Sequence, residues 1–431
     1  SMSYAKYESY KDSGVDWLRE IPEHWQLKRL KYVLAERNER SKTGEEPLFM
    51  VSQKYGLVVR ADYHDKAEIA QSNIDNKIVY KNDLVFNKLK PHLGVFYKSE
   101  IDFKGLVSPD YAVYKVKNYI YDMKYLELLF RNPKYIEQFI IRATGIVEGL
   151  IRLYTTELFE LPVMIPPREE QEKILNFLHG KTAQIDQAIA LKQQQIEKLN
   201  EYKQIVIQNA VTKGLNPNAP MKNSGVEWIG DIPEHWEMVS IKRIAKISPK
   251  VDLSNYKLDE KVTFLPMEKV SSNGDIDCEI LKPIRKVKQG FTAFKKNDVI
   301  LAKITPCFEN GKGALLDKLE TEIGYGSTEF HVLRASKRIK AYYLYLITHS
   351  SNFLTLGEAM MTGSAGQKRV PTDFVANYQF PLPPMSEQQQ IIEYVENLNR
   401  KISDTIQSYQ TQIHRLKEYK NILINQAVTG K

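Results

Sequence analysis

Two segments of this 431-residue chain occur twice, in the same order. Residues 11–25 (KDSGVDWLREIPEHW) match residues 222–236 (KNSGVEWIGDIPEHW) at ten of fifteen positions. Ile196–Thr212 matches Ile413–Thr429 at ten of seventeen positions. Because an internal repeat marks one structural plan used more than once, the chain should fold into two similar halves. The sequence between the repeated segments diverges, so the two halves would present different surfaces.

Weaker landmarks keep their order between the repeated segments. They are short, and each combines turn-forming residues with charged or aromatic ones, which is typical of loops at strand ends. The pairs are Lys81-Asn82-Asp83 with Lys296-Asn297-Asp298, Pro91 with Pro306, Ser108-Pro109-Asp110-Tyr111 with Ser327-Thr328-Glu329-Phe330, Thr144-Gly145 and Arg152 with Thr362-Gly363 and Arg369, and Pro166-Pro167 with Pro383-Pro384.

A long polar segment with apolar residues in near-heptad steps follows each Pro-Pro pair. This spacing predicts a helix with one narrow apolar stripe. Pro167 and Pro384 suit the start of such a helix, and Gly214 and Gly430 suit its end. The stripe residues are Ile174, Leu178, Ile185, Ile189, Ile196, Leu199, Val206 and Ala210 in the first copy, and Ile391, Val395, Ile402, Ile406, Ile413, Leu416, Leu423 and Ala427 in the second.

A stripe this narrow needs a partner helix, and the obvious partner of each copy is the other copy. Paired in this way, the two helices would hold two globular regions at a fixed distance. Residues 182–213 would span roughly 45 Å at about 1.5 Å per residue, or about thirteen base pairs of B-DNA. The helices could therefore act as a ruler along DNA. A dimerisation coiled coil unrelated to DNA is the alternative that periodicity leaves open.

Residues 26–165 and 237–380, the two variable regions, contain short β-rich runs broken by turns. Helical stretches follow near Asp122–Arg142 and Ile339–Met361. At about 140 residues each region has a comfortable domain size, and the pattern predicts a compact α+β domain in each. The expected β-rich runs are Lys77–Phe86, Leu93–Tyr97, Asp110–Val116, Val262–Leu265, Asp298–Ile304 and Glu329–Leu333.

The charge balance and the loop chemistry favour a nucleic-acid partner. Lys and Arg total 61 against 53 Asp and Glu, a formal net charge of +8, which suits a polyanion without establishing one. Loop Lys and Arg suit phosphate contacts, and Arg, Gln and Asn can read base edges, although many such residues are only solvated. The candidate DNA-binding residues are Asn87, Lys88, Lys90, Thr144, Gly145 and Arg152 in the first region, and Lys303, Lys312, Thr362, Gly363, Gln367, Lys368 and Arg369 in the second.

No catalytic or metal-binding constellation emerges from the sequence. Cys278 and Cys307 match no metal-ligand spacing, and two cysteines imply no disulfide framework. Gly180-Lys181-Thr182 resembles the end of a phosphate-binding loop, but Leu175 stands where that loop needs a glycine. Glu201-Tyr202-Lys203 fits a helical surface better than a nuclease site. No methyltransferase motif of the Asn/Asp-Pro-Pro-aromatic type and no glycine-rich cofactor loop occurs.

The doubled motifs together resemble those of the type I restriction–modification specificity (S) subunits. The resemblance rests on Ile-Pro-Glu-His-Trp at residues 21–25 and 232–236, and on Pro-Pro-x-x-Glu-Gln at residues 166–171 and 383–388. The helix ends (Leu-x-Glu-Tyr-Lys…Ala-Val-Thr) and the loop Thr-Gly-Ser-Ala-Gly-Gln-Lys-Arg at residues 362–369 add to it. The match spans nearly the whole chain. Residues 144–167 follow a different loop pattern, Gly-Ile-Val-Glu-Gly-Leu-Ile-Arg at residues 145–152, as expected if the two domains read different bases.

The resemblance implies an α+β chain with two tandem target-recognition domains and two long conserved helices in an antiparallel coiled coil. It places the first domain at residues 11–165 and the first helix at 166–214. The second domain, with a short linker, would occupy residues 215–380, and the second helix 381–431.

As implied by the family, the chain would be non-catalytic and would read a bipartite, asymmetric double-stranded DNA site. It would dock two modification subunits and the restriction subunits. Those partners, not this chain, would use S-adenosylmethionine, ATP and Mg²⁺. No cofactor or metal is expected in this chain.

We expect a cytoplasmic protein, because the sequence shows no apolar run of eighteen residues and no signal-peptide profile. Two other function classes stay open as rivals. One is a self-contained restriction or methylation enzyme, whose signature would be a cofactor motif. The other is a coiled-coil scaffold without a nucleic-acid role, against which the basic, glycine-rich loops argue.

Overall fold

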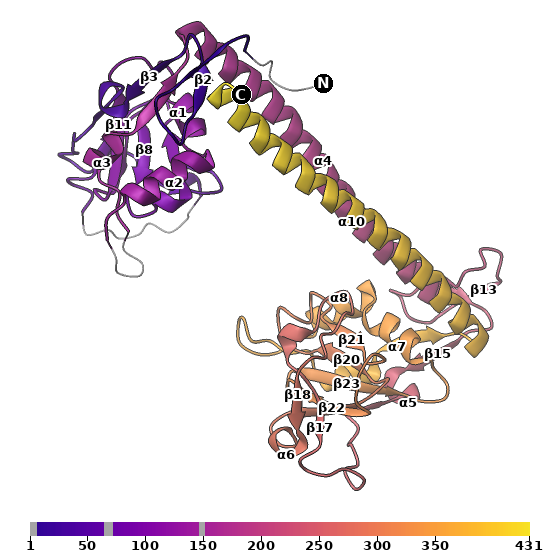
Figure 1. Ribbon diagram of the computed structural model, residues 1–431. Helices are drawn as coiled ribbons and strands as arrows, with labels where there is room; N and C mark the ends of the chain where they lie inside the picture. The colour runs from indigo at the N-terminus through magenta and orange to yellow at the C-terminus, as the bar shows by residue number, and fades with distance from the viewer. Residues whose placement is uncertain (1–6, 64–71, 146–150) are drawn as a thin grey trace. The chain divides into compact units, whose positions relative to one another are not determined.

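The computed structural model describes residues 7–63, 72–145 and 151–431. The chain divides into two compact units, each containing one variable region and part of both long helices (Figure 1). Unit 1 comprises Ser1–Lys192 with Thr411–Lys431, and unit 2 comprises Gln193–Gln410. Each unit therefore combines one domain with the start of one long helix and the end of the other.

An antiparallel four-stranded sheet, in the order β4-β11-β8-β9, forms the centre of the unit 1 domain. Its residues alternate between two faces: Leu84 and Phe86 join the main core with the helices, and Val85 faces a second, smaller core. The strands are β4 (Leu34–Glu36), β8 (Leu84–Asn87), β9 (Phe96–Lys98) and β11 (Tyr111–Val116), and the helices are α1 (Lys124–Leu129), α2 (Pro133–Arg142) and α3 (Thr155–Phe159).

Unit 2 repeats this sheet as β16-β23-β20-β21, again antiparallel. It adds a second four-stranded sheet, β18-β17-β22-β19, in which only the pairing of β17 with β22 is parallel. The strands are β16 (Ala245–Ile247), β20 (Val299–Ala302), β21 (Gly313–Leu315), β23 (Phe330–Ala335), β17 (Lys261–Leu265), β18 (Leu281–Pro283), β19 (Thr292–Lys295) and β22 (Ile323–Gly326). The helices are α5 (Ile241–Ile244), α6 (Ile284–Val287), α7 (Ala341–Thr348), α8 (Ser351–Ala359) and α9 (Thr372–Asn377).

Short two-stranded sheets close each domain in the same way. The strand after each Ile-Pro-Glu-His-Trp motif pairs with the strand before the long helix, so the two ends of each domain meet. These pairs are β3 (Gln26–Arg29) with β12 (Pro162–Ile165), and β15 (Glu237–Ser240) with β24 (Gln379–Leu382). The remaining pairs are β1 (Tyr10–Asp12) with β2 (Glu20–Pro22), β13 (Met221–Asn223) with β14 (Asp231–Pro233), β5 (Phe49–Ser52) with β6 (Gly56–Val59), and β7 (Lys77–Val79) with β10 (Gly105–Val107).

The long helices are α4 (Arg168–Lys213) and α10 (Met385–Thr429), each starting one residue after its Pro-Pro pair (Figure 1). In unit 1 they pair antiparallel: Lys192 Nζ donates to Gln412 Oε1 at 2.5 Å, and Lys420 Nζ to Asp186 at 2.7 Å. The expected stripes supply buried residues to both units. Antiparallel pairing of the two copies is thus confirmed.

Each long helical stretch expected within the domains is interrupted by a helix cap. Asn132 precedes Pro133, and its side chain accepts a hydrogen bond from the Lys134 amide at 2.9 Å, which starts α2. Ser350 caps α8 by accepting from the Phe353 amide at 3.4 Å. Both expected helical stretches are thus present, each divided into two helices. The sequence pattern indicated which stretches are helical but not the capping residues at which each stretch is interrupted. Of the described helices, none is long and apolar enough to cross a membrane.

Candidate nucleic-acid interface

In unit 1, several of the predicted DNA-binding residues gather where strand β8 ends. Asn87 is the last residue of β8, and the carbonyl of Lys88 accepts a hydrogen bond from the Leu153 amide at 3.0 Å. Thr144 and Arg152 form a two-residue antiparallel bridge, with both backbone hydrogen bonds at 2.9 Å. Gly145 follows Thr144 with φ +116°, a conformation that favours glycine. Residues 146–150 of the expected loop lie outside the described residues.

Unit 2 builds the same arrangement with other side chains. Lys303 follows β20, and its carbonyl accepts from the Val370 amide at 2.8 Å. Thr362 and Arg369 form the equivalent backbone bridge, at 3.0 and 2.9 Å. The loop between them is exposed, so Gln367 and Lys368 face solvent. Because the backbone scaffold is shared and the side chains differ, this loop has the properties of a variable recognition surface.

An acidic residue faces the loop arginine in each unit. Glu329 binds the Arg369 guanidinium through two carboxylate–nitrogen contacts, at 2.7 and 2.9 Å. The remaining Arg369 Nη1 donates to the Gln367 carbonyl at 3.3 Å. In unit 1 the contact is looser, with 3.8 Å between Arg152 and Asp110. Arg369 therefore holds its loop to the start of β23, and its guanidinium is not free to read a base in this state.

This pairing sets the ionisation of Glu329. A hydrogen bond from Arg369 is the main cause that lowers the pKa of Glu329, with further lowering by the positive charges of Arg369 and Lys303. The carboxylate is therefore charged at neutral pH. It partly cancels the positive charge of its loop, and the net basic character there rests on Lys303 and Lys368.

The structure places three predicted residues around these loops rather than in them. Lys90 is exposed in the turn that leads into the 3₁₀ helix Pro91–Leu93. Lys312 is half-buried, and its carbonyl accepts from the Ala302 amide at 2.8 Å, beside the end of β20. The half-buried Asn87 side chain is already used, because its Oδ1 accepts from the Leu89 amide at 3.0 Å.

Lys77 is a cation at this edge of unit 1 that the sequence did not single out. Its side chain is buried, and Nζ donates to the Tyr111 carbonyl at 2.6 Å. Burial lowers the pKa of Lys77, and the nearby charges of Lys88 and Arg40 lower it further. Its place at the start of a short apolar strand, directly before Ile78 and Val79, was the available signal. It adds positive charge beneath the edge that carries Lys88.

The two repeated motifs contact each other at the base of each domain. Glu170, from the first Pro-Pro-x-x-Glu-Gln, accepts from Trp25 Nε1 at 3.0 Å and lies 2.6 Å from His24 Nε2. In unit 2, Glu387 accepts from Trp236 Nε1 at 2.9 Å and also contacts His235. Both tryptophans are buried. The motifs therefore have a structural role: they fix each domain to the first turn of its long helix.

The glutamine of each motif completes this junction. Gln171 Nε2 donates to the carbonyls of Pro166 and Tyr119, at 2.9 and 2.8 Å. Gln388 Nε2 donates to those of Pro383 and Arg338, at 2.9 and 3.1 Å. Both side chains are buried, so they satisfy backbone groups that water cannot reach. Within the part of the chain that the structure describes, no cluster of three His, Cys, Asp or Glu could hold a metal ion.

Comparison with known families identifies the chain. The family described as the type I restriction modification DNA specificity domain matches residues 22–201 and again 233–415. The chain belongs to this family, as its doubled motifs indicated. The two matches cover the two variable regions and much of each long helix, so the chain contains the family's domain twice.

Relatives of this chain carry names of the same kind. It is 46% identical over 164 residues to the type I restriction enzyme EcoAI specificity subunit of Escherichia coli. That match covers 38% of this chain and 28% of the relative, so only about a quarter of the E. coli protein is matched. The MjaVIII specificity subunit of Methanocaldococcus jannaschii is 27% identical over 451 residues, covering 100% of this chain and 97% of the relative.

Solved structures share the fold at low sequence identity. A chain from a study of complex assembly and conformational transition of the type I R-M system superposes with a TM-score of 0.67 at 14% identity, covering 95% of this chain and 99% of that one. The HsdS subunit from Thermoanaerobacter tengcongensis gives a TM-score of 0.52 at 14% identity, covering 95% and 98%. The fold of two tandem α+β domains with two long helices is therefore confirmed.

Proposed function

We propose that this chain is the DNA-recognition subunit of a type I restriction–modification complex and has no catalytic activity of its own. Each unit would read one half of a bipartite, asymmetric DNA site with the loop cluster at the end of β8 or β20. The observation that carries this proposal is the same Thr–Arg backbone bridge in both units, closing loops of different sequence. Such a design suits two different half-sites.

Phosphate contacts would supply affinity, and a few exposed side chains would supply specificity. We assign phosphate contacts to Lys88, Lys90, Lys303 and Lys312, with Thr144 and Gly145 in unit 1 and Thr362 and Gly363 in unit 2 shaping the loops. Gln367 and Lys368 are exposed and free to reach base edges. Arg152 and Arg369 would act by holding their loops, unless DNA displaces the acidic partner.

The long helices would set the spacer between half-sites and dock the partner subunits. Modification subunits would bind S-adenosylmethionine and methylate DNA, and restriction subunits would use ATP and Mg²⁺. The names of the relatives support this division of labour, because they are called specificity subunits of restriction enzymes. A site on chromosomal DNA implies a cytoplasmic location, which is part of the same proposal.

Purification with the cognate modification subunit, followed by sequencing of methylated bases in host DNA, tests the proposal. The expected result is one bipartite methylated motif that disappears when the gene for this chain is deleted. Binding of the complex to DNA carrying that motif should weaken steeply with salt, because phosphate contacts release counter-ions. A complex that forms while no methylated motif depends on this chain would contradict the recognition role.

A coiled-coil scaffold without a nucleic-acid role is the second candidate, favoured by the extent of α4 and α10. It predicts partner binding with no sequence preference for DNA. A salt titration of DNA binding by the purified complex separates the two, since a scaffold would give no specific component at any salt concentration.

A further inference from the structure

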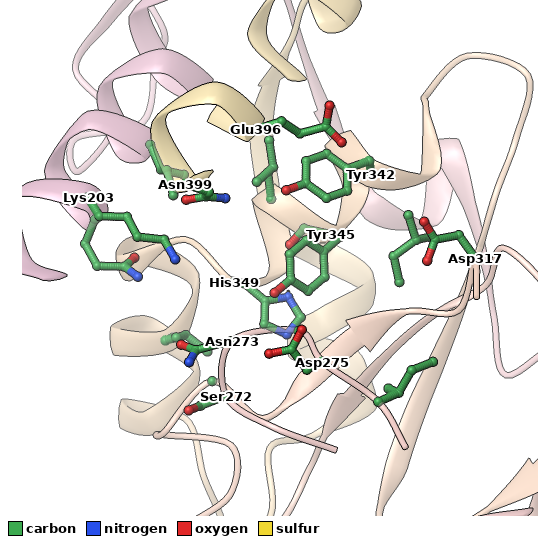
Figure 2. A pocket seen from close by; sticks show the side chains of 18 of the residues that line it. Lys203, Ser272, Asn273, Asp275, Asp317, Tyr342, Tyr345, His349, Glu396 and Asn399 are labelled. Atoms are coloured by element: carbon green, nitrogen blue, oxygen red, sulfur yellow. The ribbon is translucent and has the colours of Figure 1, made fainter. Parts of the chain in front are cut away.

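Unit 2 has a cleft of about 370 Å³ between its helices and the turn at residues 271–275 (Figure 2). Helix α7 supplies Tyr342 and Tyr345, and His349 follows directly at its C-cap; Figure 2 shows the Tyr345 and His349 rings near the centre of the cleft. The two rings stack with centroids 4.2 Å apart. The long helices contribute to the rim, with Lys203 from α4 and Glu396 and Asn399 from α10, and Asp275 and Asp317 come from loops.

Unit 1 has a cleft at the corresponding place, also of about 370 Å³. Val211 and Val428 are the same position of the repeated helix end. Tyr125 Oη donates to the Val428 carbonyl at 3.0 Å, and Tyr343 Oη donates to the Val211 carbonyl at 3.4 Å, so the two tyrosines correspond. Residues next to these tyrosines are therefore equivalent, which pairs Lys124 of unit 1 with Tyr342 of unit 2.

The acidic rim is equivalent as well. The amides of Ser99 and Leu316 each donate at 2.8 Å, to the carbonyls of Asp83 and Asp298 respectively. The residues that follow, Glu100 and Asp317, therefore occupy the same position, and both line their cleft.

Unit 1 pairs the carboxylates of this cleft with its own cations. Lys124 Nζ lies 3.0 Å from Glu127 and 4.0 Å from Glu100. Arg131 contacts Glu127 at 3.0 Å as well. The lysine of the repeated helix end, Lys420, is held by Asp186 at 2.7 Å. Every carboxylate in this set therefore has a basic side chain of the same unit beside it.

Unit 2 keeps the carboxylate and loses the two helix cations, although Lys203 and Lys318 also line its cleft. Tyr342 replaces Lys124, and His349 stands at the position of Arg131. Glu396 adds a carboxylate where unit 1 has His179. Within the described residues, neither Asp317 nor Glu396 makes an ion pair or a hydrogen bond through its side chain. The same two positions of the fold thus carry basic side chains in unit 1 and uncharged rings in unit 2.

An acceptor on the cleft floor is also unsatisfied. His349 Nδ1 lies 2.9 Å from the Tyr345 carbonyl and must donate to it, because a carbonyl oxygen can only accept. The imidazole is neutral at pH 7, since burial lowers its pKa to about 4, and Nε2 is therefore a bare acceptor. It is buried and has no hydrogen-bond partner among the described residues. Nε2 lies against the backbone of Gly313, so the groups that an N–H-donating occupant would meet are the exposed carboxylates of Asp317 and Glu396.

We propose that the unit 2 cleft binds an arginine or lysine side chain of a protein partner, with Tyr342 as its aromatic platform and Asp317 and Glu396 as its counter-ions. Cations bind to tyrosine faces, and a guanidinium fits carboxylates through paired hydrogen bonds. Lys124 is the internal equivalent of this cation in unit 1. Asp275 would balance Lys203 on the opposite side of the cleft, since the two attract each other.

The occupant is assigned to a partner subunit because α4 and α10 form part of the rim. In the proposed function these helices dock the modification subunits, and the inference rests on that proposal. Two copies of one modification subunit would therefore meet a cation-accepting cleft in unit 2 and, in unit 1, a cleft whose carboxylates already have basic partners. The two docking positions would then differ in affinity.

Titration of the full-length chain with its cognate modification subunit tests the inference. We expect Asp317→Asn combined with Glu396→Gln to weaken binding at one of two sites by about tenfold at low salt. Tyr342→Lys, which imports the unit 1 cation, should weaken that site at least as much. Glu100→Gln in unit 1 is the matched control and should change affinity by less than about twofold. Thermal unfolding of the variants should stay close to the wild type, because Asp317 and Glu396 are exposed.

Wild-type affinity in both unit 2 variants would overturn the inference while leaving the proposed function intact. Failure of the wild-type chain to bind the modification subunit would count against the proposed function itself. Agmatine, a guanidinium probe, separates a partner's side chain from a free small cation. If agmatine quenches tyrosine fluorescence in the wild type but not in Tyr342→Lys, while both bind the partner equally, the cleft takes a free cation and the partner assignment is wrong.

Discussion

At the scale of single residues, the repeated Lys-Asn-Asp sequence shows how a short motif determines local structure. Asn82 and Asn297 have positive φ angles, 66° and 69°, and asparagine tolerates this conformation better than most residues. Asp83 then accepts from the Tyr80 amide at 2.8 Å and binds Arg37, while Asp298 accepts from the Lys295 amide at 2.7 Å and binds Arg334. The turn and its ion pair are thus preserved, although Arg37 directly follows β4 while Arg334 lies in β23.

His349 should make the stability of unit 2 depend on pH. Its pKa is lowered to about 4 by burial, whereas an unfolded histidine has a pKa of about 6.5. Above pH 6.5 both states are neutral and the group has no effect. As the pH falls from about 6.5 to about 4, the unfolded state takes up a proton that the folded state cannot, so the free energy of unfolding should drop by about 2–3 kcal/mol.

Chemical denaturation at a series of pH values measures this effect, and His349→Gln is the control. The variant should lose the part of the pH dependence that falls between pH 4 and pH 6.5. An unchanged pH profile in the variant would mean that His349 is not the group responsible.

At the scale of secondary-structure elements, the junction of each domain with its long helix depends on one glutamate. Glu387→Ala removes the acceptor of Trp236 Nε1 and leaves a buried donor without a partner. We expect a loss of about 1–3 kcal/mol in the stability of unit 2. Glu393→Ala, at an exposed position of the same helix, should change stability by less than about 0.5 kcal/mol. Thermal unfolding of both variants compares the two; equal losses would argue against a special role for Glu387.

The helix stripe supplies the second prediction at this scale. Ile196 and Ile413 are both buried, and replacing both with aspartate places two charges in the apolar stripe. We expect the helix pairing and partner docking to fail while each domain keeps its fold. Leu191→Asp on α4 is the control, since Leu191 is 53% exposed. Circular dichroism and co-purification with the modification subunit give the two readouts, and retained docking in the double variant would refute the ruler.

At the scale of the whole molecule, the repeat implies that the two recognition surfaces are independent. Each domain has its own central sheet and its own main hydrophobic core. Exchanging residues 26–165 for those of another family member should therefore change one half of the methylated motif and leave the other half as it was. Sequencing of methylated host DNA reads both halves at once. A change in both halves would show that the domains read DNA jointly.

The sequence by itself determined the plan of this protein. The doubled motifs gave two domains of one family, and the near-heptad stripe gave two long helices that pair with each other. These features are visible because they rest on local chemistry: period, turn residues and caps act over a few neighbours in the chain. The start of each helix after Pro167 and Pro384 follows from the same local rules.

Only the tertiary structure decided which side chains meet. Glu170 and Trp25, 145 positions apart, form a hydrogen bond, and Glu329 and Arg369, 40 positions apart, form an ion pair. That Asp317 has no counterpart of the Lys124–Glu100 pair becomes visible only when the two clefts are compared. No periodicity encodes contacts of this kind, because they depend on how strands and helices pack rather than on near neighbours. Equivalent residues of the repeat therefore have different roles, as Lys124 in the cleft of unit 1 and Tyr342 in the cleft of unit 2 illustrate.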